Sequence, residues 1–337
     1  MIEIDGSEGE GGGQVVRNAC ALSLVTGTPF RITKVRGGRE KPGLMRQHVT
    51  AIEAACTVGN ATCEGLTIGS SEIVFRPGRV VAGEYNFAVG TAGSTGLVLQ
   101  TVLMPLVLAD QPSRLVLEGG THNMLAPPFD FIVKSFLPII KRMGPTVTAR
   151  LVRPGFYPRG GGRIEVDVTP APLRAIVCVD RGALIDRSAL AMFAAIPPGV
   201  ADREIATARK LLDWPDETFA VRELPESQGP GNILLLEAAF EHVSEVVSGF
   251  GKLGVSAERV AQTAVGRMTG YLASDAFAGP YLADQLLLPF ALAGGGAFTT
   301  VKPSQHSYTA AAVIEQFLDR RCGFTQLLSG AHRLDVR

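Results

Sequence analysis

Three segments of this chain of 337 residues share one plan, and this internal repetition constrains the fold more than any other feature of the sequence. Each segment has a glycine-containing start, an apolar helical run, a turn, a β-type strand, a polar loop and a second helical run. The segments span residues 9–58, 90–143 and 279–318. One such unit buries little apolar surface, whereas units that pack together share a core. The plan therefore predicts an α/β fold in which three repeated units, each with two helices on one face of a β-sheet, form a large domain.

The stretch between the second and third units does not follow this plan. It contains helical runs at 200–212 and 256–272, with strand-like runs between them. The third unit resumes only after this stretch, so we expect a small inserted α/β domain at 175–275. The large domain would then consist of residues 1–174 and 276–337.

Composition and charge exclude several classes of protein. A hydrophobic fraction of 46% and a charged fraction of 19% are typical of a soluble globular protein, and the length favours two domains. The 32 Lys and Arg balance the 32 Asp and Glu, so the chain lacks the large basic surface of a protein that coats long duplexes. A local basic pocket for one nucleic-acid end remains compatible with this balance.

The cysteines and apolar runs indicate the compartment. Five scattered cysteines without metal-ligand spacing predict reduced thiols, as in a cytosol. The N-terminus does not resemble a signal peptide, and the longest apolar run, 95–108, is too short to span a bilayer. We therefore expect a cytoplasmic protein without membrane contact.

His306 lies at the end of one of three equivalent loops. The strand 298–301 ends in a proline-containing turn, and His306 follows at the start of the helical run 307–318. Helix N-termini offer free N–H groups to anionic oxygens, so an imidazole held there could attack phosphorus. A helix-capping histidine has the same pattern. The equivalent loops are 36–40 and 119–123, and packing of the units would bring all three toward one cleft.

The glycine-rich start of the first unit allows backbone to approach a phosphate, because glycine has no Cβ. Residues 9–13 are not a P-loop, since no Gly-Lys-Ser/Thr follows, and no acidic residue ends a second strand as in a dinucleotide-binding fingerprint. Glu10 is a candidate ligand for Mg²⁺, which prefers carboxylate oxygens. The alternative is a tight turn.

Cationic and nucleotide-binding candidates lie in other parts of the plan. A cationic group at the first loop could grip a phosphate bidentately, or could be a solvated surface; it consists of Arg17, Arg36, Arg39, Lys41 and Arg46. Tyr281 could stack on a base and Asp284 could accept from an adenosine amine or hydroxyl, or both could simply open a helix. Gln100 interrupts an apolar helix and needs a partner, either a ligand or the core.

Together, these residues resemble the RNA 3′-terminal phosphate cyclases over essentially the whole chain. The resemblance rests on spaced motifs in one order: Asp5-Gly6, Glu10 to Gln14 with Arg17, Arg39 to His48, Gln100, Ala126 to Phe131, Gly155 to Gly162, Gln228 to Asn232, Tyr281 to Gln285, and Pro303-Ser304-Gln305-His306. Gln305 stands where some members of the family carry Cys. The family has three repeated α/β units and a small inserted domain, which agrees with the plan derived above.

The resemblance implies an enzyme, an ATP-dependent RNA 3′-phosphate cyclase and nucleotidyl-transferring ligase. His306 would attack the α-phosphate of ATP to give a histidine–AMP intermediate. AMP would pass to an RNA 3′-terminal phosphate, and the adjacent 2′-hydroxyl would close the 2′,3′-cyclic phosphate. ATP and a divalent cation, Mg²⁺ or Mn²⁺, are the implied cofactors, and RNA with a 3′-terminal phosphate is the implied partner.

The resemblance also implies the roles of individual residues. The adenine-binding set is Gln100, Pro127, Phe131, Tyr281, Leu282, Ala283, Asp284 and Gln285, with Tyr281 and Pro127 on either side of the base. The set around the RNA phosphate is Arg17, Arg36, Arg39 and Gln47, and Glu10 matches a metal-contacting glutamate. A related branch without the histidine acts in ribosome assembly, so a non-catalytic RNA-binding assembly factor is the alternative. A third class is an unrelated transferase that binds anionic small molecules.

Overall fold

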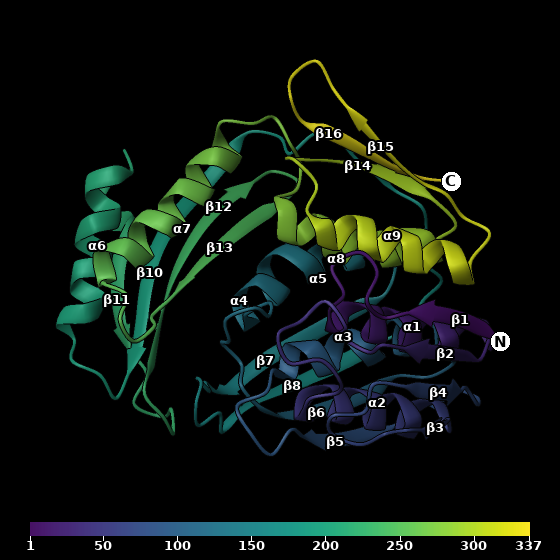
Figure 1. The fold of residues 1–337 in the computed structure, drawn as a ribbon. Coiled ribbons are helices and arrows are strands. Elements are labelled where there is room, and N and C mark those ends of the chain that lie inside the picture. The colour runs from purple at the N-terminus through teal and green to yellow at the C-terminus, as the bar shows by residue number, and fades with distance from the viewer.

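Three four-stranded sheets with one strand order account for most of the molecule (Figure 1). The structure is a computed structural model that describes residues 1–337. In each unit the first two strands pair in parallel and the last two join the sheet antiparallel, in the order first, second, fourth, third. The expected fold class of three repeated α/β units with an inserted α/β domain is confirmed.

The first unit comprises β1 (Ile2–Asp5), α1 (Gly13–Thr26), β2 (Phe30–Thr33), α2 (Arg46–Gly59), β3 (Thr62–Glu64) and β4 (Ile73–Arg76). The second comprises β5 (Glu84–Ala88), α3 (Thr95–Val107), β6 (Ser113–Gly119), α4 (Phe129–Phe131), the π-helical η1 (Ile132–Phe136), α5 (Leu137–Met143), β7 (Thr146–Arg153) and β8 (Gly162–Thr169). The third comprises β9 (Val177–Cys178), α8 (Pro280–Leu292), β14 (Gly296–Thr300), α9 (Gln305–Phe317), β15 (Cys322–Gln326) and β16 (His332–Val336).

A fourth sheet forms the inserted domain between β9 and α8. Its elements are β10 (Leu184–Ala194), α6 (Gly199–Leu211), the 3₁₀ turn η2 (Asp216–Thr218), β11 (Phe219–Glu223), β12 (Gly231–Phe240), β13 (Ser244–Phe250) and α7 (Ala257–Leu272). The strand order is β11-β10-β12-β13, and α6 and α7 cover one face (Figure 1). Because β9 pairs with β14, residues 177–178 belong to the third unit's sheet.

The second helix of the second unit is interrupted, although its apolar pattern predicts one helix over 128–143. The amide of Leu137 donates to Ile132 O, which is the five-residue spacing of a π-helical turn. Pro138 follows directly and has no amide hydrogen to donate to the preceding turn. The helix therefore widens at 132–136 before it resumes as α5.

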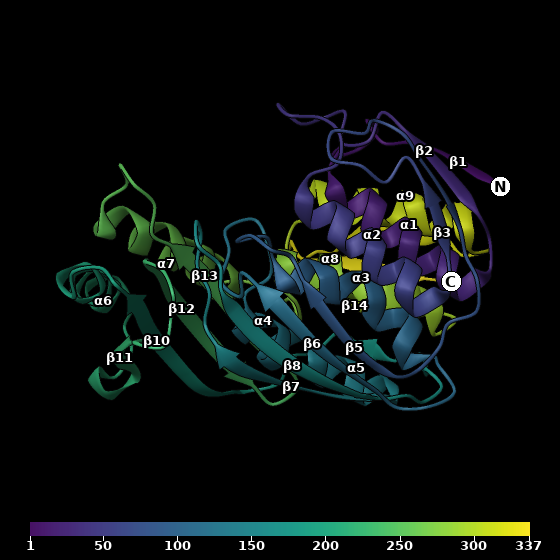
Figure 2. The same cartoon turned by 90° about the horizontal axis from the view of Figure 1, so that it is seen from below.

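The helices lie inside and the three repeated sheets outside (Figures 1 and 2). Helix α1 contacts α3 and α9, and α8 contacts α9, so helices from all three units meet in the centre. One cluster of 83 buried apolar residues runs through the units and the inserted domain, which explains how units that bury little alone are stable together. None of the helices combines the length and the apolarity needed to cross a membrane.

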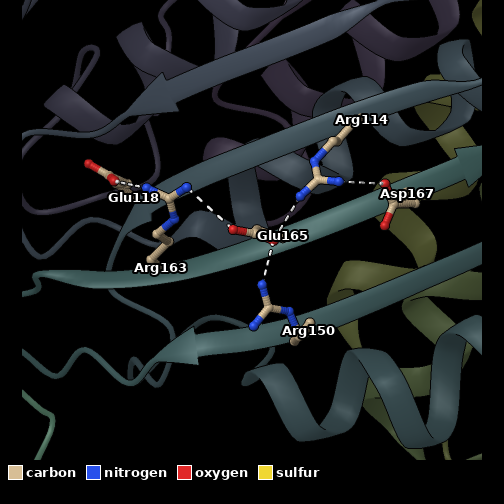
Figure 3. A network of polar contacts seen from close by, with 6 residues as sticks. All are labelled: Arg114, Glu118, Arg150, Arg163, Glu165 and Asp167. Carbon is tan, nitrogen blue, oxygen red and sulfur yellow. Dashed lines mark hydrogen bonds and ion pairs between the residues drawn. The ribbon is translucent and has the colours of Figure 1, made fainter.

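The outer face of the second sheet carries a network of ion pairs (Figure 3). Glu165 on β8 lies at its centre, 2.7 Å from Arg150 and 3.0 Å from Arg114. Three arginines and three acidic residues take part: Arg114, Glu118, Arg150, Arg163, Glu165 and Asp167. Because these charges balance one another, this face is not the cationic surface that an RNA phosphate would need.

Candidate active site

His306 is the second residue of helix α9, so it lies in the first helical turn rather than in the preceding loop. Ser304 caps this helix, and its Oγ accepts the amide hydrogen of Ser307 at 3.3 Å. The cap fixes where the helix begins. It therefore fixes the direction in which the imidazole leaves the helix, toward the start of α1.

The imidazole of His306 contacts the glycine-rich end of the first unit. Its Nδ1 lies 3.0 Å from Gln14 Oε1 and 2.9 Å from Glu10 Oε2. An amide oxygen only accepts hydrogen bonds, so the contact with Gln14 favours the tautomer with hydrogen on Nδ1. Nε2 then carries the lone pair. The side chain of His306 is 41% exposed, so a ligand can reach it.

The surroundings of His306 favour its neutral form. Burial lowers the pKa of His306, and the positive charges of Arg17 and Arg39 lower it further, while the carboxylate of Asp284 opposes them. The net direction is a pKa below the ordinary 6.5. At neutral pH the group is therefore an unprotonated imidazole, which is the nucleophilic form.

The glycine-rich segment and the loop at 36–40 lie against each other. The amide of Gly38 donates to Gly11 O at 3.3 Å. Gly11 has a φ of +57°, and a Cβ there would come within 2.7 Å of the Gly38 backbone, so the close approach requires glycine. Arg39 of this loop forms an ion pair with Glu10. Two of the three equivalent loops thus meet at His306.

Glu10 has the properties of a cation ligand. Its Oε2 is buried and has no hydrogen-bond partner, although His306 Nδ1 is close. Its backbone amide is held by Thr309 Oγ1 of α9 at 2.9 Å. No group of three or more His, Cys, Asp or Glu side chains could hold a metal ion unaided. A cation here would need phosphate and water oxygens besides Glu10, which is the usual coordination of Mg²⁺.

The four residues predicted to surround the RNA phosphate have different neighbours. Arg17 is half-buried, and partial removal from water lowers its pKa to about 10. Arg36 Nη1 donates to Lys41 O at 2.7 Å and to Gly43 O at 2.8 Å, so this guanidinium holds its own loop together. Gln47 Oε1 accepts from the amide of Ser94 at 3.4 Å, at the junction with the second unit. Arg17 and Arg39 are the two whose charges act on His306.

Two adjoining cavities lie beside this centre. The first is mainly apolar and is lined by Leu99, Gln100, Leu103, Pro127, Phe131, Ile132, Phe136 and Gln285. The second includes Gln14, Arg17 and Asp284 in its lining and shares Gln100, Leu103, Phe136 and Gln285 with the first. An apolar slot thus opens toward polar groups beside His306, an arrangement suited to a flat heterocycle joined to an anionic group.

Two residues of the segment 281–285, Asp284 and Gln285, line the cavities. Asp284 is buried and accepts from Ser304 Oγ at 2.8 Å and from Ser307 Oγ at 2.5 Å, so it holds the start of α9. Burial raises the pKa of Asp284, whereas the two serine hydroxyls act in the other direction. Gln285 lines both cavities and hydrogen-bonds to Gln100.

The other three residues of this segment do not line either cavity. Leu282 and Ala283 are fully buried in the core. Tyr281 is 46% exposed, and the guanidinium of Arg267 lies 5.9 Å from the centre of its ring. Its ring therefore remains accessible to an aromatic ligand from outside.

Three contacts at the centre were not expected from the sequence. Gln14 touches His306, Ser307 helps to bind Asp284, and Thr309 holds Glu10. Gln14 belongs to a motif that the sequence did single out. Thr309 gave no local signal, because its partner lies 299 residues away in the chain.

Comparison with known proteins gives one consistent result. A family model described as RNA 3′-terminal phosphate cyclase matches residues 8–324. A protein of Koribacter versatilis with that name is 50% identical over 319 residues, which cover 94% of this chain and 90% of the relative. A relative of the same name from Ralstonia nicotianae is 52% identical, over 94% of this chain and 91% of the relative. Another, from Ectopseudomonas mendocina, is 47% identical, over 100% of this chain and 98% of the relative.

Proposed function

Because this chain belongs to the RNA 3′-terminal phosphate cyclase family, we propose that it is an enzyme that uses ATP to convert an RNA 3′-terminal phosphate into a 2′,3′-cyclic phosphate. The observation that carries the proposal is the half-exposed imidazole of His306, whose Nδ1 lies 3.0 Å from Gln14 Oε1. Gln14 accepts its Nδ1 hydrogen, and Nε2 is left with a lone pair. The five free cysteines agree with a cytoplasmic enzyme.

In the first step Nε2 of His306 attacks the α-phosphorus of ATP. A nitrogen–phosphorus bond forms, the bond between the α-phosphorus and the bridging oxygen breaks, and pyrophosphate leaves. The imidazole ring becomes positively charged, while Nδ1 keeps its hydrogen and continues to donate it to Gln14 Oε1. Glu10 Oε2, 2.9 Å from Nδ1, and the carboxylate of Asp284 favour that charge.

In the second step an oxygen of the RNA 3′-phosphate attacks the same phosphorus, the bond to His306 breaks, and AMP passes to the RNA. The vicinal 2′-hydroxyl then attacks the 3′-phosphorus, loses its proton and displaces AMP, which closes the cyclic phosphate. The intramolecular attack benefits from a high effective concentration. Arg39 and Arg17 are cations beside His306 that can hold the RNA phosphate in line, and Arg36 and Gln47 keep the adjoining loops in place.

We assign the adenine base to the apolar cavity. Pro127 and Phe131 offer apolar surface, Gln100 and Gln285 offer amides, and the exposed ring of Tyr281 can cover the other face of the base. Leu282 and Ala283 support Asp284 and Gln285 from the core. Glu10 would hold the divalent cation, Mg²⁺ or Mn²⁺, which when bound spreads the negative charge of the phosphates.

The two other classes of function predict different behaviour. A non-catalytic RNA-binding assembly factor has no use for a nucleophile, so the lone pair of His306 Nε2 favours the enzyme. An unrelated transferase for anionic small molecules would not be inhibited by RNA with a 3′-phosphate end. Competition between such an end and the same RNA with a 3′-hydroxyl distinguishes these classes.

The direct test is incubation with ATP that carries radioactive phosphorus in its α-phosphate. We expect the wild-type protein to become labelled and His306→Asn to remain unlabelled, with circular dichroism and thermal unfolding like those of the wild type. Addition of RNA with a 3′-phosphate should discharge the label and yield a phosphatase-resistant end. An unlabelled wild-type protein, or a labelled His306→Asn variant, would overturn the proposal.

A further inference from the structure

Glu245 lies on strand β13 of the inserted domain, yet its carboxylate binds a helix of the large domain. Its Oε2 accepts the amide hydrogen of Gly279 at 2.9 Å, and Gly279 is the N-cap residue of α8. Glu245 is 1% exposed. A Cβ on Gly279 would come within 2.6 Å of the Glu245 carboxyl carbon, so the helix start and the carboxylate are in close contact.

A buried carboxylate is unfavourable unless nearby groups compensate for lost hydration. The N-terminus of α8 supplies both a hydrogen-bond donor and the positive end of the helix dipole. Burial raises the pKa of Glu245 to about 7, although the hydrogen bond from Gly279 opposes this shift. Glu245 can accept from Gly279 in either protonation state.

Other bonds make this junction rigid. Tyr271 Oη donates to Phe277 O at 2.9 Å, and Thr300 Oγ1 of β14 donates to Ala278 O at 2.9 Å. Arg181, in the connection from β9 to β10, donates to Tyr271 O and Leu272 O, so that connection is tied to the last turn of α7. The segment that leads from α7 into α8 is thus held on both sides.

Helix α8 links this junction to the start of α9, where His306 lies. Asp284 lies one turn and a half beyond Gly279 and binds Ser304 and Ser307, the residues on either side of the position of His306 in the first turn of α9. Gln285, the next residue, lines both cavities. A displacement of the first turn of α8 would therefore move the cavity wall and the start of α9 together.

The charge of the inserted domain argues against a main role in gripping RNA. Residues 184–272 carry 8 Lys and Arg against 12 Asp and Glu, in a chain whose formal net charge is zero. An acidic domain repels a phosphate backbone. Contact with α8 is accordingly the better account of what this domain contributes to the reaction.

We propose that Glu245 is a positioning residue through which the inserted domain fixes helix α8, and with it the nucleotide cavity and His306. The kinetic part of this inference rests on the proposed ATP-dependent adenylylation; the structural part does not. Glu204 on α6 provides a matched control, because it is also fully buried in the inserted domain but binds Asn232 of β12 instead of α8.

The test compares Glu245→Ala, Glu245→Gln, Gly279→Ala and Glu204→Ala with the wild type. Loss of the bond to Gly279 should raise the ATP concentration for half-maximal labelling about tenfold in Glu245→Ala, which corresponds to about 1.4 kcal/mol. Gly279→Ala disturbs the same contact from the side of α8, so it should also raise the ATP concentration for half-maximal labelling. Glu245→Gln keeps an acceptor oxygen and should stay close to the wild type, and Glu204→Ala should lower thermal stability without changing the ATP requirement.

Hydrogen exchange of the protein without ATP supplies a readout that does not depend on catalysis. We expect faster exchange at the first turn of α8 and at the first turn of α9 in Glu245→Ala, and no such change in Glu204→Ala. Equal exchange in the two variants would overturn the inference, even if the wild type failed to react with ATP. A labelled wild type with the same ATP requirement in Glu245→Ala and Glu204→Ala would overturn it while leaving the proposed function intact.

Discussion

Removal of Arg39 should separate the two halves of the proposed reaction. In the structure Arg39 forms an ion pair with Glu10, whose Oε2 lies 2.9 Å from Nδ1 of His306. The Arg39 side chain is 40% exposed and Glu10 is 13% exposed, so the arginine is on the open side of the pair. This position suits contact with an incoming RNA phosphate.

The expected magnitude follows from the loss of one charge-assisted hydrogen bond. Such a contact is worth roughly 1.5–3 kcal/mol, so Arg39→Ala should slow discharge of AMP to RNA by about 10- to 150-fold. Loading of AMP at mildly alkaline pH should stay close to that of the wild type, because the nucleophile is neutral there in both proteins.

Loading at acidic pH should fall in Arg39→Ala, because the pKa of His306 should rise. Burial is the main cause of the low pKa of His306, and the charges of Arg17 and Arg39 add to it. Without Arg39 the pKa of His306 rises toward its ordinary value of 6.5, so the imidazole becomes protonated at a higher pH than in the wild type. The acid limb of the loading rate should therefore shift upward in pH.

The assay isolates adenylylated protein, adds RNA with a 3′-phosphate but no ATP, and follows the loss of label. Arg79→Ala is the matched control, since it removes an arginine that pairs only with exposed Asp110. If Arg39→Ala discharges normally but fails to load at alkaline pH, the loop at 36–40 faces the nucleotide and the assignment of Arg39 to RNA is wrong.

The other expectations concern the base, the glycine-rich loop and a core thiol. Tyr281→Ala should raise the ATP concentration for half-maximal labelling, since stacking on a base is worth about 1–3 kcal/mol. ATP should label the wild type and GTP should not. Equal labelling by both nucleotides would argue against an adenine-specific cavity. Thr309→Val leaves the amide of Glu10 without its partner, which costs about 1–3 kcal/mol. The thermal unfolding temperature and the labelling of this variant should therefore fall, while Thr309→Ser should stay near the wild type. A Thr309→Val variant with unchanged stability and labelling would contradict the contact. Burial raises the pKa of the Cys20 thiol, so it should react with a thiol reagent only after unfolding, and rapid labelling of native protein at Cys20, read by mass spectrometry, would refute this.

The local order of elements was readable from the sequence. Helices α1, α3, α6 and α7 begin and end within two residues of their apolar runs, because glycine, proline or a serine cap marks most of their ends and apolar spacing marks their buried faces. Strands β10 and β13 gave no such signal. The first five residues of β10, from Leu184 to Ser188, are mostly exposed, so apolar and polar residues do not alternate there.

The residue types at the candidate active site were also readable, because the histidine, the carboxylate and the arginines each lie in a distinctive local motif. His306, Glu10 and Arg39 could be named from such motifs as candidates for their chemistry. Their mutual contacts could not, since His306 and Gln14 are 292 residues apart and Glu10 and Thr309 are 299 apart. Local sequence sets backbone preference and burial, but not which loops meet.

Tertiary packing decided which candidates face the cleft and which support it. Arg36 has the same chemistry as Arg39, but its guanidinium is taken up by two carbonyls of its own loop. Asp284 binds Ser304 and Ser307 at the start of α9, and Glu245 of the inserted domain holds the start of α8. A charged side chain can satisfy its hydrogen bonds with a ligand or with the protein, and only the packed arrangement of the three units and the insertion determines which partner is within reach.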